Sequence, residues 1–140
     1  MRRRDLVLLL GAALAAAHTS AAQQRPVPLV GFLSPRVVVE NSSIDAFRRG
    51  LRELGYVEGQ TIAVELRSSE GENSRLAAVA AELASLKPDV IVTNGEPAIR
   101  AVKAAAGTIP IVMGVVGDPV AAGFAQSLAH PGGTLTGLTN

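Results

Sequence analysis

Segments with the pattern of strands alternate with segments with the pattern of helices, and this alternation limits the possible fold more than any other feature. Compact apolar runs at 28–33, 90–92 and 109–116 are typical of buried strands. Residues 61–66 alternate apolar and polar side chains, which places this strand at a sheet edge, and 135–138 form a last short strand. The pattern predicts an α/β fold, a doubly wound parallel sheet of strand order 2-1-3-4-5 with helices on both faces.

Helical periodicity fills the intervals between these strands. Ser42 and Asp45 have capping-box spacing at the start of the first helix, which ends before Gly55, and Asn73 is a candidate cap for the second. Apolar residues that recur three or four positions apart predict the side of each helix that faces the core. These residues are Ile44, Phe47, Leu51 and Leu54 on the first helix and Leu76, Val79, Ala80, Leu83 and Leu86 on the second. Further helices are predicted at about 97–106 and, in a shorter form, from Asp118 to about 129.

The N-terminal 22 residues have the layout of an export signal. A basic start at 1–5 precedes an apolar run at 6–17 and a stretch of small residues at 18–22. The apolar run is shorter than the roughly 20 residues that span a bilayer, which favours a cleaved signal over a retained membrane helix. Arg3 and Arg4 fit a twin-arginine signal, and ordinary secretion is the alternative. We expect a periplasmic protein with a tether at 23–27.

Composition excludes several classes of function. Without residues 1–22 the chain has ten basic and eleven acidic residues, so it lacks the charge excess of a nucleic-acid binder. It has no cysteine, which excludes disulfides and thiolate metal sites. His130 stands alone at a predicted helix end, and neither a dinucleotide motif nor a nucleophile elbow occurs. We therefore predict no enzyme, no metal and no cofactor.

Polar residues follow the predicted strands at their carboxyl ends, where the ligand crevice of such a sheet lies. The candidate ligand-binding residues are Ser34, Thr93, Asn94, Gly95 and Asp118. Helices that begin near the same edge direct backbone N–H groups toward it, which suits a carboxylate or another small anion. Two alternatives are structural: Asn94 and Gly95 could form only a turn, and Asp118 could be only a helix cap.

The order of motifs in the chain resembles a known family. The segments that carry the resemblance are 30–34 (VGFLS), 46–60 (AFRRGLRELGYVEGQ), 88–93 (PDVIVT), 109–112 (IPIV), 117–123 (GDPVAAG) and 131–137 (PGGTLTG). They resemble the N-terminal half of the ABC transporter substrate-binding proteins of the type I periplasmic-binding kind. The resemblance extends over essentially the whole chain after the signal.

The resemblance implies a two-lobed receptor that closes on a small solute and delivers it to a membrane permease. Members are associated with amino acids, notably aromatic ones, among other small solutes. By this resemblance residues 28–140 are expected to be the N-terminal α/β lobe. Members are about twice this length, so we expect the second lobe to be absent here, either because the sequence is truncated or because the chain is a lone first lobe. Glu96 stands where the family usually has threonine, and its carboxylate is expected to repel an anionic ligand group. The alternative function is an exported ligand-sensing domain of a signalling receptor.

Overall fold

The computed structural model describes residues 27–38, 42–130 and 132–139. The strands are β1 (Leu29–Ser34), β2 (Ala63–Ser68), β3 (Val90–Thr93), β4 (Ile111–Val116) and β5 (Leu135–Thr139). The helices are α2 (Ser42–Glu53), α3 (Leu76–Ser85), which follows the 3₁₀ turn η2 (Asn73–Arg75), and α4 (Glu96–Ala105). The predicted export signal lies outside the described residues, and so does its tether apart from Val27.

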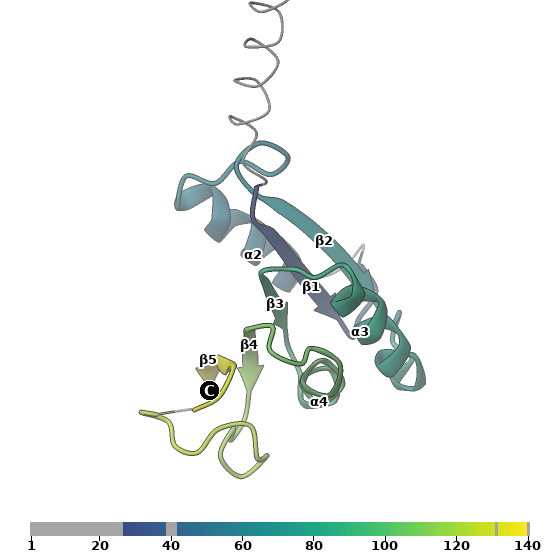
Figure 1. Cartoon of the computed structure of the whole chain (residues 1–140), viewed down its shortest axis with the longest axis vertical. Coiled ribbons are helices and arrows are strands. Elements are labelled where there is room, and N and C mark those ends of the chain that lie inside the picture. The colour runs from purple at the N-terminus through teal and green to yellow at the C-terminus, as the bar shows by residue number, and fades with distance from the viewer. Residues whose placement is uncertain (1–26, 39–41, 131, 140) are drawn as a thin grey trace, which may run out of the picture.

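The sheet has the predicted order, β2-β1-β3-β4-β5, and every strand pair is parallel. Figure 1 shows the strands side by side in this order, with β2 at one edge and β5 at the other. β1 ends level with β2, where Ser34 pairs with Ser68, and one residue beyond its pairing with β3, where Leu33 pairs with Thr93. The carboxyl ends of these three strands therefore lie at one edge of the sheet.

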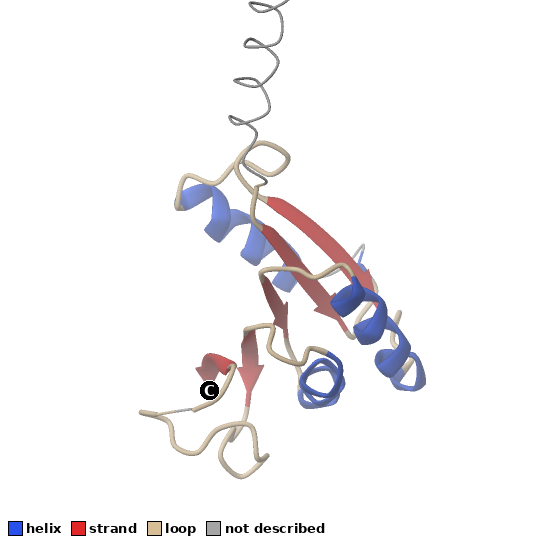
Figure 2. Ribbon diagram, viewed as in Figure 1, coloured by secondary structure: helices blue, strands red, loops and turns tan. Residues whose placement is uncertain are grey.

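Helices cover both faces of β1. The ring of Phe32 packs on Phe47 of α2, with centroids 5.1 Å apart. Gly31, which precedes Phe32, contacts Leu83 of α3: a Cβ at Gly31 would lie 3.0 Å from that side chain. Successive strand residues point to opposite faces, so α2 and α3 cover opposite faces of the sheet. In Figure 1, α2 fades behind the sheet, whereas α3 and α4 stand in front of it; Figure 2 distinguishes these helices from the strands by colour.

The main apolar core lies between the sheet and the pair α3 and α4. Fully buried side chains come from both layers, and the largest are Leu33, Leu83, Ile91, Ile99 and Ile111. Burial of these apolar surfaces is the main free energy that holds the two layers together. Within the described ranges, no helix has both the length and the apolar character needed to cross a bilayer.

Three local predictions about helices are wrong. Leu54 is 76% exposed because α2 ends at Glu53, and Leu86 is 43% exposed because α3 ends at Ser85. Asn73 does not cap α3: it begins η2, and Arg75 precedes the helix without a side-chain capping bond. Apolar residues at the predicted ends thus lie beyond the last helical turn, where the chain leaves the core.

The predicted helix from Asp118 to about 129 is also wrong. Asp118 Oδ1 accepts hydrogen bonds from the backbone N–H groups of Val120 and Ala121, each at 3.0 Å. A single turn follows, in which Phe124 N–H donates to Pro119 O at 2.8 Å. Gly123 then adopts φ 78°, a left-handed conformation that ends helical turns. The described residues from there to β5 contain turns and bends and no further helix.

Candidate functional site

The candidate site lies where the strand order reverses. The chain passes from β1 to β2 on one side and returns to β3 on the other, so the loops after β1 and β3 separate at this point. In open α/β sheets such a switch point forms the ligand crevice. Ser34 ends β1 and Thr93 ends β3, as the sequence predicts.

Both of these hydroxyl residues are fully buried and hydrogen-bonded inside the lobe. Thr93 Oγ1 donates to Leu33 O across the β1–β3 pair at 2.9 Å. Ser34 Oγ donates to Arg36 O at 3.0 Å and accepts from Arg36 N–H at 3.1 Å. The carboxyl ends of β1, β2 and β3 and the loops that follow them form the rim of the sheet at this point. Because each hydroxyl already has partners in the protein, Ser34 and Thr93 hold the backbone of this rim in place.

Asn94 and Gly95 form the turn between β3 and α4. Gly95 adopts φ 81° immediately before the first residue of α4, a backbone conformation that favours glycine. A Cβ at Gly95 would lie 3.8 Å from Pro35 Cγ, so this turn rests against the loop after β1. Asn94 is half-buried, and a Cβ at Gly114 of β4 would be 3.2 Å from its Cβ. The turn therefore lies between the ends of β1 and β4.

The side chain of Asn94 is the polar, half-buried group of this turn. No hydrogen bond joins its amide to another residue of the described ranges, and it is not fully buried. An amide offers both a donor and an acceptor.

Asp118 lies farther beyond the last β3–β4 pair than the other candidate residues do. β4 continues from Met113, the partner of Thr93, to Val116 before Asp118 is reached. The carboxylate is exposed and accepts the two N–H groups of its own turn. This structural role is one of the two readings that its sequence position allows.

Glu96 is neutralised by a neighbour on its own helix. Its Oε1 accepts from Arg100 Nη2 at 2.6 Å and from Arg100 Nε at 3.1 Å, one turn along α4. Both side chains are about half exposed. Arg100 therefore offsets the charge that the sequence analysis expects to repel an anionic ligand.

Two serines that the sequence does not single out lie at the end of β2 and directly after it. Ser68 Oγ donates to Arg36 O at 2.6 Å, and the fully buried Ser69 donates to Pro35 O at 3.2 Å. Gly71 N–H donates to the same Pro35 carbonyl at 2.9 Å. The signal for these residues is the parallel pairing itself: a strand next to β1 and level with it brings its own loop to the same rim.

Comparison with known proteins identifies the family. Residues 36–140 match the family described as ABC transporter substrate binding protein. A tyrosine-binding protein of Clostridioides difficile is 32% identical over 107 residues, which are 74% of this chain and 31% of that protein. The chain thus spans about a third of the length of this relative.

Two solved structures share the fold. The ABC domain from Streptococcus pneumonia in complex with L-Trp has a TM-score of 0.71 and 27% identity, over 81% of this chain and 38% of that one. The ligand-free, open structure of a Clostridium difficile substrate-binding protein with adhesive properties also has a TM-score of 0.71, with 29% identity over 81% and 39%. With three quarters of its length matching the family, this chain belongs to the ABC transporter substrate-binding proteins.

Proposed function

We propose that residues 28–140 form the N-terminal lobe of a solute receptor that binds an amino-acid-like molecule and delivers it to an ABC permease. The observation that carries the proposal is the polar rim at the β1–β3 switch point, in a chain of the substrate-binding family. Two similar proteins are described as a tyrosine-binding protein and as a complex with L-Trp, which supports an aromatic amino acid as the solute class.

One lobe supplies only one wall of such a site. Small-molecule sites enclose most of their ligand, and two-lobed receptors achieve this by hinge closure. The rim offers a half-buried amide at Asn94 and a loop held by buried hydroxyls, and a second lobe would supply the opposite wall. Closure would then exclude water from the polar contacts and strengthen them.

We also propose that residues 1–22 direct export to the periplasm and are removed there. Small residues at positions 20 and 22 satisfy signal peptidase, so cleavage is expected before Gln23. Mass spectrometry of the periplasmic protein should give an N-terminus within a residue or two of this position. Periplasmic material that retains Met1 would contradict the proposal.

The binding test is calorimetric titration of the full gene product carrying this chain with L-tyrosine and L-tryptophan. Asn94→Ala should weaken binding by about 1–3 kcal/mol, because a ligand group loses its partner. Gln60→Ala is the control, since Gln60 precedes β2 at the opposite end of the strands. Thr93→Val should affect affinity less than Asn94→Ala, because the Thr93 hydroxyl already donates to Leu33. Absence of binding by the unsubstituted protein to any amino acid would refute the proposed function.

A further inference from the structure

The backbone of Arg36 is held in place by serine hydroxyls from the last residues of β1 and β2. Its N–H donates to Ser34 Oγ at 3.1 Å, and its carbonyl accepts from Ser34 Oγ at 3.0 Å and from Ser68 Oγ at 2.6 Å. The preceding carbonyl, of Pro35, accepts from Ser69 Oγ and from a backbone N–H. Each peptide group that flanks Arg36 therefore has hydrogen bonds that restrain it, although the residue lies outside any strand or helix.

The side chain that this backbone carries is exposed and cationic. Arg36 follows β1 by two residues, and the Pro35 ring before it lies against the Asn94–Gly95 turn at the switch point. A long side chain on this loop is thus attached beside the switch point of the sheet.

The Arg36 guanidinium forms no ion pair with a carboxylate in the described part of the chain. Glu96 pairs with Arg100, and the Asp118 carboxylate accepts backbone N–H groups. Among the other arginines near this edge, Arg67 pairs with Glu65, and Arg75 lies beyond the edge strand in η2. Arg36 is the arginine of this group that lies beside the reversal of strand order.

We propose that Arg36 is the residue that recognises the carboxylate of the ligand, with Ser34 and Ser68 as positioning residues for its backbone. The inference rests on the proposed function, since it assumes an amino-acid-like solute. A guanidinium binds a carboxylate through paired charge-assisted hydrogen bonds. Fixing the backbone in advance reduces the conformational entropy lost when the ligand binds.

The test compares an acid with its neutral amide. Affinities of the full gene product for L-tyrosine and L-tyrosinamide are measured by calorimetry, with competition against L-tyrosine where the amide binds weakly. Arg36→Gln should weaken L-tyrosine binding on the order of tenfold or more, the loss for a charge-assisted hydrogen bond, and leave the amide nearly unchanged. Arg36→Lys should retain part of the preference, because it keeps the charge and loses the planar geometry.

Arg75→Gln is the matched control, since it removes an exposed arginine from the same edge of the sheet without touching the switch point. Equal losses for acid and amide in Arg36→Gln, or no loss for either, would overturn the inference while the proposed function stands. An unsubstituted protein that binds no amino acid would overturn the proposed function, and the inference with it.

The positioning role has its own pair of variants. Ser68→Val removes the hydroxyl that reaches Arg36 O, whereas Ser68→Thr keeps it in a side chain of the same shape. The preference for acid over amide should fall in the valine variant and be retained in the threonine variant. If both variants keep the preference, Ser68 does not position Arg36.

Discussion

Two connecting regions of this lobe are held by different means. The last residues of β1 and β2 and the loops after them, residues 34–36 and 68–71, are joined by hydroxyl and N–H groups that donate to two backbone carbonyls. The described residues between β4 and β5, 117–130 and 132–134, are attached to α4 through the ring of Phe124, which is 5% exposed, and through hydrogen bonds from Arg100 to Ala122 O and from Lys103 to Gly123 O. Arg100 and Lys103 of α4 lie over that ring, 5.2 and 6.0 Å from its centroid.

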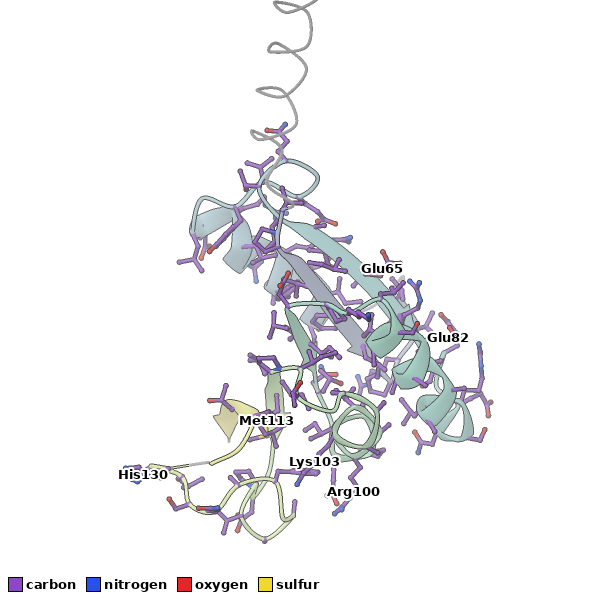
Figure 3. The ribbon with its side chains drawn as sticks, in the orientation of Figure 1. Glu65, Glu82, Arg100, Lys103, Met113 and His130 are labelled. Atoms are coloured by element: carbon purple, nitrogen blue, oxygen red, sulfur yellow. The ribbon has the colours of Figure 1, made fainter. Side chains whose placement is uncertain are left out.

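The two kinds of contact differ in how strongly they restrain the backbone. Short hydroxyl bonds are directional, and the side chains that make them have little entropy to lose. Arg100 and Lys103 are long exposed side chains, seen extending from α4 in Figure 3, whose contacts water and salt weaken. The loops after β1 and β2 are therefore held by directional bonds, whereas the β4–β5 segment combines burial of the Phe124 ring with exposed contacts to Arg100 and Lys103.

Phe124→Ala is expected to have the largest effect. Removing this buried ring from the core that includes Val102 and Leu135 should lower the free energy of unfolding by about 3 kcal/mol. Urea denaturation followed by circular dichroism measures the change. Phe124→Leu is the control, because it keeps most of the apolar volume and should cost less than half as much. Equal stability of the alanine variant and the parent would show that this segment is not anchored by the ring.

Thr93→Val tests the region fixed by hydroxyl groups. The substitution keeps the shape of the side chain and removes its bond to Leu33 O, so it should cost about 1 kcal/mol of stability. Thr93→Ser, which retains the hydroxyl, should recover that bond. A valine variant that is as stable as the parent would mean that the hydroxyl does not stabilise the β1–β3 pair.

Arg100→Met should have the smallest effect. It removes the ion pair to Glu96 and the contact over Phe124 but keeps an unbranched apolar stem, so a loss of about 0.5 kcal/mol is expected for such exposed contacts. The loss should shrink as salt is added, because screening weakens the ion pair in the parent. A loss that does not change between low and high salt would assign the effect to packing alone.

The strands were predictable because their signal is local. Buried strands such as β1 and β3 appear as uninterrupted apolar runs, and the alternation with helices leads to a parallel sheet. Strand order then places Ser34 and the Asn94–Gly95 turn at one edge, as expected from the sequence. Helix ends were less predictable, because an apolar residue such as Leu54 continues the periodic pattern past the point where the chain turns away.

The remaining features depend on contacts between residues far apart in the chain. Ser68 and Ser69 reach carbonyls 32 and 34 positions earlier, and no local pattern records such a bond. The region after Asp118 has a helix-like start, yet Gly123 ends it after one turn and Phe124 turns back onto α4.

The sequence by itself determined the α/β class, the strand order and the edge of the sheet where polar groups gather. Side-chain periodicity and chain connectivity are enough for these, since both are properties of successive residues. Only the tertiary structure decided which polar groups are already occupied: Thr93 bonds to Leu33, Glu96 to Arg100, and the serines to the Arg36 loop. The availability of a donor or acceptor depends on which neighbours folding brings within about 3 Å, and that distance is set by packing of the whole lobe.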